Sequence, residues 1–125
     1  MYEVSLVGMV VCHMIVFVDG KKYTIKEPRP ATLKKYGLSL NDWKEILAVQ
    51  GYRCPICLNV LCKTTNIDHF HAQGWSKMSD EKRKLYVRGI TDWYCNKNAL
   101  YKGISIEKLQ RTVQYLIDFE KRKPK

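Results

Sequence analysis

Two cysteines separated by two residues, Cys54 and Cys57, constrain the fold of this 125-residue chain more than any other feature. This spacing lets two thiolates of a tight turn face one tetrahedral metal ion. A redox-active pair normally begins a helix after a buried strand, whereas this pair follows a helical pattern. The sequence therefore favours metal binding over thiol redox chemistry.

A metal ion held by this pair needs two further ligands from elsewhere in the chain. Cys95 is the expected third ligand, and the position three residues before it holds Asp92. A carboxylate oxygen can bind zinc, although three thiolates with one carboxylate make a rarer and harder site than four thiolates. Cys62 is the rival fourth ligand, with burial in a strand as its other interpretation. The spacing favours Asp92. Cys12 and His13 are weaker candidates, because neighbouring strand residues face opposite sides.

The charge of the chain indicates its class of partner. Twenty-two Lys and Arg residues against twelve Asp and Glu residues give a formal charge of +10. Such a balance favours a polyanion, and nucleic acid is the expected partner. Two basic runs are candidates for contacts with a phosphate backbone, with a solvated charged face as their other interpretation: Lys82-Arg83-Lys84 and Lys121-Arg122-Lys123.

The cysteine count and the apolar N-terminal stretch bear on the compartment. Five cysteines are an odd number, which excludes a fully paired disulfide framework and favours a reducing compartment. The stretch from Val4 to Val18 is too short to cross a bilayer and lacks a basic region before it. We therefore expect a cytoplasmic protein with no membrane partner, located in the host cell cytoplasm if a phage encodes it.

The sequence predicts an N-terminal β-hairpin followed by two helices. Asp19-Gly20 is a strong hairpin signal between two strand-like segments. Pro30 and Gly37 are typical of the first turn and the cap of a short helix. Ser39 and Asp42 resemble an N-cap pair for a second helix, which runs up to about Gly51.

A last helix capped by Ser105 is expected near the C-terminus. Its apolar residues recur at helical spacing and form one stripe: Ile106, Leu109, Val113, Leu116 and Ile117. Such a stripe usually belongs to the core of the same chain. In a chain this small, the helix could also pack against a second copy.

The segment Asp68-His69-Phe70-His71 places an acid and two of the chain's three histidines within four residues. In an extended segment Asp68 and His69 face opposite sides, so a bend is needed to bring both to one ion. A lone histidine is more often a hydrogen-bonded structural group, but clustering favours chemistry.

Several spaced motifs, taken together and in order, resemble phage recombination endonuclease VII and its HNH relatives. These motifs are Leu33-Lys34-Lys35-Tyr36-Gly37-Leu38, Gln50-Gly51-Tyr52-Arg53, Cys54-x-x-Cys57, Asp68-His69-x-His71, Val87-Arg88-Gly89-Ile90 and Cys95-Asn96. The resemblance covers roughly residues 30 to 103 and leaves out the hairpin at 1–25. The chain departs from the family where Asp92-Trp93-Tyr94-Cys95 replaces a second CxxC, and where Phe70 replaces a second acid found in some members.

The resemblance implies an α+β fold with a ββα-metal (HNH) core, a structural zinc, flanking helices and the N-terminal hairpin. In such a core a β-hairpin carries His69, and a helix starting near Cys95 carries Asn96. Residues 1–27 would form an N-terminal extension, and residues 28–125 would form the endonuclease domain with the C-terminal helix.

The resemblance also implies roles for individual residues. Asp68 and Asn96 would hold one catalytic Mg²⁺ or Mn²⁺, which prefer oxygen ligands. His69 would be the general base, and His71 would contact phosphate or steady the site. The implied activity is metal-dependent hydrolysis of duplex or branched DNA, by a homodimer if two strands are cut together. The alternative is a zinc-stabilised DNA-binding module without catalysis, which would need the charge and the cysteines but not this trio.

Three further side chains near these motifs have two interpretations each. Arg88 would contact phosphate, or would fix the turn at Gly89. Trp93 and Tyr94 are expected to form core around the metal rather than to stack on bases.

Overall fold

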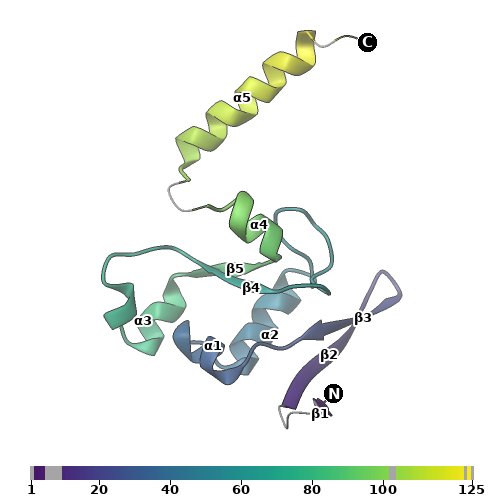
Figure 1. Ribbon diagram of the computed structural model, residues 1–125, viewed down its shortest axis with the longest axis vertical. Coiled ribbons are helices and arrows are strands. Elements are labelled where there is room, and N and C mark those ends of the chain that lie inside the picture. The colour runs from purple at the N-terminus through teal and green to yellow at the C-terminus, as the bar shows by residue number, and fades with distance from the viewer. Residues whose placement is uncertain (1, 5–9, 102–103, 123, 125) are drawn as a thin grey trace.

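The computed structural model describes residues 2–4, 10–101, 104–122 and 124, and confirms the predicted α+β class (Figure 1). Its strands are β1 (Tyr2–Val4), β2 (Val10–Val18), β3 (Lys21–Lys26), β4 (Asn66–His69) and β5 (Val87–Thr91). Its helices are α1 (Pro30–Lys35), α2 (Leu40–Val49), the 3-10 helix η1 (Trp75–Lys77), α3 (Asp80–Leu85), α4 (Trp93–Asn98) and α5 (Ile106–Arg122). Residues 5–9 of the apolar N-terminal stretch and Lys123 of the basic tail lie outside the described residues.

The N-terminal hairpin is formed by β2 and β3, as predicted, and β1 adds a third antiparallel strand along β2. Asp19 and Gly20 both have positive φ angles, 52° and 77°, as a two-residue turn between twisted strands requires. Val16, Val18 and Ile25 are buried in the same apolar cluster as residues of α2. The hairpin therefore packs on the rest of the chain through one face.

The two short helices after the hairpin also follow the prediction. Ser39 Oγ accepts a hydrogen bond from the Asp42 backbone N–H at 3.1 Å, and Asp42 Oδ2 accepts one from the Ser39 N–H at 2.9 Å. This reciprocal capping box satisfies two backbone donors that a helix start leaves unpaired. Helix α2 then buries Trp43 and Leu47 completely, which makes it the centre of the core.

Strands β4 and β5 form a second antiparallel hairpin, joined by a long connection that contains η1 and α3 (Figure 1). The Gln50 side chain at the end of α2 holds β5 in place. It accepts a hydrogen bond from the Ile90 N–H at 2.9 Å and donates one to the Ile90 carbonyl at 2.8 Å. A Cβ atom at Gly89 would lie 2.8 Å from Gln50 Oε1, so a glycine permits this close approach.

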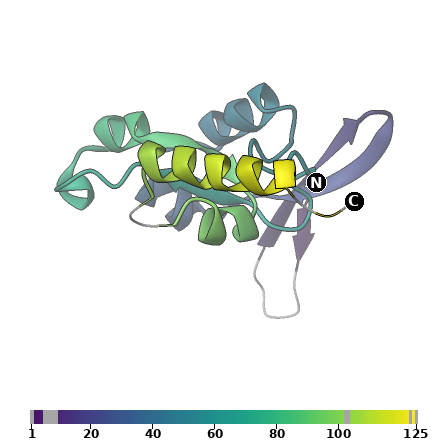
Figure 2. The same cartoon turned by 90° about the horizontal axis from the view of Figure 1, so that it is seen from above.

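The prediction that the C-terminal stripe belongs to the core is wrong. Helix α5 extends away from the other elements (Figure 1), and in the view from above it lies in front of them (Figure 2). All five stripe residues are exposed by between 42% and 72%. Helical periodicity identifies the apolar face of a helix but does not say what covers it. Among the described residues, no helix is long and apolar enough to cross a membrane.

Candidate functional site

The structure brings Cys54, Cys57, Asp92 and Cys95 together, with their possible ligand atoms all within 4.8 Å of one another. The first two lie in a tight turn after α2. The Leu58 N–H closes this turn by donating to the Cys54 carbonyl at 2.9 Å. The other two lie at the start of α4, so the cluster joins segments about forty residues apart in the chain.

Asp92 has two roles at this cluster. It is the N-cap of α4, where its Oδ1 accepts a hydrogen bond from the Cys95 N–H at 2.7 Å. Its Oδ2 accepts a hydrogen bond from Cys57 Sγ at 2.8 Å. Because Asp92 caps it, the helix begins at Trp93, two residues before the expected start near Cys95. One carboxylate oxygen of Asp92 is thus fixed by the Cys95 backbone N–H, while the other faces the thiols.

The acidic groups of the cluster disturb one another's protonation. Burial, together with hydrogen bonds to the neighbouring Cys57 and Asp92, raises the pKa of Cys95 to about 12. A hydrogen bond to Asp92 raises the pKa of Cys57 and lowers that of Asp92. A divalent cation at the centre would favour the ionised form of every member. Three thiols and one carboxylate at this spacing suit a structural zinc ion, although the set is harder than four thiolates.

The rival ligand Cys62 is an exposed free thiol and is not a member of the described cluster. Cys12, on β2, is half-buried and also lies outside it. The geometry therefore agrees with the spacing argument that favoured Asp92 as the fourth member.

Asp68, near the end of β4, is buried and paired with Arg88 of β5. Its two oxygens accept hydrogen bonds from Arg88 Nε at 2.7 Å and from Nη2 at 2.9 Å. The register of the two strands shifts at this point, because Asp68 lies opposite Gly89 whereas His69 lies opposite Val87. Arg88 is the extra residue of this bulge. The sequence predicts that it contacts phosphate or fixes the turn at Gly89, and does not predict its pairing with Asp68.

His69 follows the bulge and is surrounded by three aromatic rings. The ring centroids of His71 and Trp75 lie 4.5 Å from that of His69, and that of Tyr36 lies at 5.2 Å. Burial lowers the pKa of His69, the charge of His71 lowers it further, and Asp68 opposes both. These surroundings therefore favour the neutral form of the imidazole.

Two of these neighbours were not candidates from the sequence. Tyr36 belongs to one of the motifs that carry the family resemblance, so a signal for it was present. Trp75 lies in the connection between β4 and β5, where no pattern in the sequence pointed to it.

Asn96 lies on α4, which packs against β4. Its backbone N–H donates to the Asp92 carbonyl at 3.0 Å, and its half-buried side chain makes no hydrogen bond to the described residues. The amide oxygen is thus available for a ligand. The structure accordingly places Asp68, His69 and Asn96 on adjoining elements, β4 and α4.

The expectation that Trp93 and Tyr94 form core is wrong. Trp93 is exposed by 52% and Tyr94 by 68%. Because α4 begins at Trp93 and turns Cys95 toward the cluster, both aromatic side chains lie on the outer part of its first turn.

Of the basic run 82–84, Arg83 pairs with Asp80, and Lys84 pairs with Asp42 at 2.8 Å.

The fold and this site define a small α+β protein with a cluster of three cysteines and one aspartate that could hold a metal ion, and with a β-hairpin that carries His69. The chain belongs to the recombination endonuclease VII family, whose model matches residues 30–118.

Two phage proteins are similar to this chain. The Gene 59 protein of Mycobacterium phage D29 is 34% identical over 87 residues, which is 67% of this chain and 46% of that protein. The Gene 59 protein of Mycobacterium phage L5 is 32% identical over 89 residues, 69% of this chain and 48% of that protein. The chain thus spans about half the length of these relatives. No solved structure matches it.

Proposed function

We propose that this chain is a metal-dependent DNA endonuclease of the HNH type, with its cleavage centre at Asp68, His69 and Asn96. The observation that carries the proposal is the half-buried imidazole of His69 next to Asp68 at the bulge of β4, on a hairpin followed directly by the helix of Asn96. The order β4, β5, α4 matches the order of elements expected for a ββα-metal core. Family membership and the formal charge of +10 support DNA as the substrate.

The donor set of this centre suits a hard divalent cation. Asp68 offers carboxylate oxygens that retain lone pairs beyond those used by Arg88. Asn96 offers an amide oxygen with no partner among the described residues. When bound there, Mg²⁺ or Mn²⁺ would supply positive charge for the leaving 3′ oxygen of the phosphodiester. A separate structural zinc would be held by Cys54, Cys57, Cys95 and Asp92.

His69 acts in this proposal as the general base that takes a proton from the attacking water. Its neutral form can accept that proton, and the surrounding rings of Tyr36 and Trp75 restrict its orientation. His71 contacts the phosphate or steadies His69. Arg88 fixes the Asp68 carboxylate at the bulge, so that acid and base lie next to each other.

A plasmid assay tests this centre. We expect the wild-type protein to nick or cut supercoiled plasmid with Mg²⁺ or Mn²⁺ and to leave it intact in EDTA. Asp68→Ala and Asn96→Ala should each need a higher concentration of Mn²⁺ for half-maximal cleavage, because each loses one of few oxygen ligands. Normal Mn²⁺ dependence in both variants would overturn the ligand assignment.

We further propose that the protein is a homodimer that pairs through α5. The exposed stripe of α5 supports this, since single-sided apolar helices commonly associate. Val113→Asp and Leu116→Asp should therefore halve the mass measured by light scattering. A wild-type protein that stays at the mass of one chain at high concentration would exclude the dimer.

The remaining features of the proposal concern the extent of the domain and its location. We assign residues 28–125 to the endonuclease domain and residues 1–27 to an N-terminal extension. The phage origin of the relatives and the five free thiols support action in the host cytoplasm. The alternative remains a zinc-stabilised DNA-binding module without catalysis, and the plasmid assay separates the two.

A further inference from the structure

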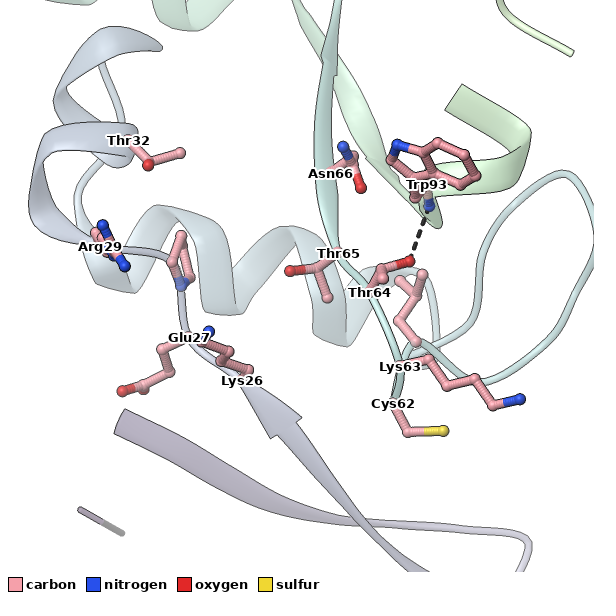
Figure 3. A pocket seen from close by; sticks show the side chains of 12 residues that line it. Lys26, Glu27, Arg29, Thr32, Cys62, Lys63, Thr64, Thr65, Asn66 and Trp93 are labelled. Atoms are coloured by element: carbon pink, nitrogen blue, oxygen red, sulfur yellow. Dashed lines mark hydrogen bonds between the residues drawn. The ribbon is translucent and has the colours of Figure 1, made fainter. Parts of the chain in front are cut away.

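A surface pocket of about 480 Å³ lies where the N-terminal hairpin meets the segment before β4. Figure 3 shows Lys26, Glu27 and Arg29 on one side of this pocket, and Lys63, Thr64, Asn66 and Trp93 on the other. The first group follows or ends β3, outside or at the edge of the part that matches the family. A second pocket of about 620 Å³ shares Lys63, Thr64 and Trp93 with it. We call the two together the Trp93 groove.

The charge of this groove is positive. Lys26, Arg29 and Lys63 have no ion-pair partner within the part of the chain that the structure describes. Glu27 is the acid of the first pocket, and its side chain is 8% exposed and paired with Lys44 at 3.2 Å. Asp92, the acid of the second pocket, accepts hydrogen bonds from Cys57 Sγ and from the Cys95 N–H. The groove therefore presents free cations to a ligand, while both of its carboxylates are already engaged.

Trp93 is the aromatic residue of the groove, and two contacts hold it in place. The Trp93 backbone N–H donates to Thr64 Oγ1 at 2.9 Å, the dashed line in Figure 3. The Lys97 ammonium lies 4.8 Å from the centre of the Trp93 ring, and Lys97 lines neither pocket. The Trp93 ring thus has a cation over one face and lines both pockets, where a planar group could stack on it.

The groove adjoins the proposed cleavage centre. Asn66 of the groove and Asp68 lie two residues apart on β4, which is roughly 7 Å along a strand. Trp93 and Asn96 lie three residues apart on α4, and positions at that spacing are neighbours on a helix surface. A nucleotide in the groove would therefore be close to the scissile phosphate.

We propose that the Trp93 groove binds an unpaired nucleotide of DNA next to the cleavage site, with its base on Trp93 and its backbone near Lys26, Arg29 and Lys63. This inference rests on the proposed DNA endonuclease function and adds a base-binding subsite beside its cleavage centre. Stacking on an aromatic ring accepts any base and requires that the base be unpaired. The groove thus adds a contact for an unpaired base that intact duplex cannot make, and the residues that end and follow β3 supply one of its walls.

The test compares two DNA ligands on the intact chain carrying His69→Ala, so that the DNA is not cut. One is a blunt duplex, and the other is the same duplex with a short single-stranded thymidine tail, each labelled for fluorescence anisotropy. We expect tighter binding of the tailed duplex by a factor on the order of ten. Trp93→Ala should abolish this preference without changing the affinity for blunt duplex, and Trp93→Phe should keep part of it.

Phe17→Ala is the matched control, because Phe17 is an exposed aromatic residue on β2 that lines neither pocket. It should leave the preference unchanged. Lys63→Ser provides a second variant if Trp93→Ala folds poorly, and it should also reduce the preference for the tailed duplex. A wild-type preference that survives both Trp93→Ala and Lys63→Ser would overturn the proposal, as would equal wild-type binding of the two ligands.

The readout separates this inference from the proposed function. A Trp93-dependent preference in a protein that cuts no DNA would support the groove while the endonuclease proposal fails. Plasmid cleavage with no effect of Trp93→Ala on the preference would leave the endonuclease standing and would overturn the groove.

Discussion

Replacing His69 with alanine is expected to slow DNA cleavage by roughly 100- to 10,000-fold, the usual contribution of a general base. His69 is the half-buried imidazole that follows the β4 bulge, and burial lowers its pKa so that it can accept a proton near neutral pH. DNA affinity should change little, because a base acts in the transition state and the binding charge lies elsewhere. Plasmid cleavage rates and duplex binding, measured on the same preparation, check both expectations.

His13→Ala serves as the control for this prediction. It removes the chain's third histidine, which lies on β2 in the N-terminal hairpin. Its cleavage rate should equal that of the wild type. A His69→Ala protein that cleaves at the wild-type rate would refute the role of His69 as base.

Replacing Cys57 with serine is expected to cause the largest loss of stability. We predict one zinc per chain in freshly purified protein, held by the cluster whose ligand atoms lie within 4.8 Å of one another. The cluster joins the turn after α2 to the start of α4, so losing the metal should lower the free energy of unfolding by more than about 4 kcal/mol. Elemental analysis and thermal unfolding measure the two effects.

Three further substitutions locate the fourth ligand. Asp92→Ala should cost less than Cys57→Ser, because water can replace an oxygen ligand at smaller cost than a thiolate. Asp92→Asn keeps an N-cap side chain and therefore separates the capping role from the metal role. Cys62→Ser should leave the zinc content unchanged. Folded protein without zinc would contradict the site, and zinc loss in Cys62→Ser alone would move the fourth position to Cys62.

Local signals in the sequence predicted most of the local structure. The Asp19-Gly20 turn and the capping box of Ser39 and Asp42 each depend on residues close together in the chain, and both are present. The association of Cys54 and Cys57 with Asp92 and Cys95 depends on distant segments, but their spacing restricted the choice enough to predict it.

Features that depend on the arrangement of whole elements could not be predicted. The pairing of Asp68 with Arg88 requires a bulge between two strands whose register the sequence does not reveal. The exposure of Trp93 follows from a helix that begins two residues earlier than expected. The exposure of the α5 stripe could not be predicted either, because periodicity does not say which elements form the core. In the structure the core contains residues of α2 and the N-terminal hairpin and none of α5.

Cleavage of a synthetic four-way DNA junction is the most direct test of the central claim. The junction carries labelled strands and is incubated with wild-type protein in Mn²⁺ or in EDTA. We predict cuts near the branch point that leave 5′-phosphate ends in Mn²⁺, and an intact junction in EDTA. A junction that is bound tightly but remains uncut in Mn²⁺ would contradict the account and would identify the chain as a zinc-stabilised DNA-binding module.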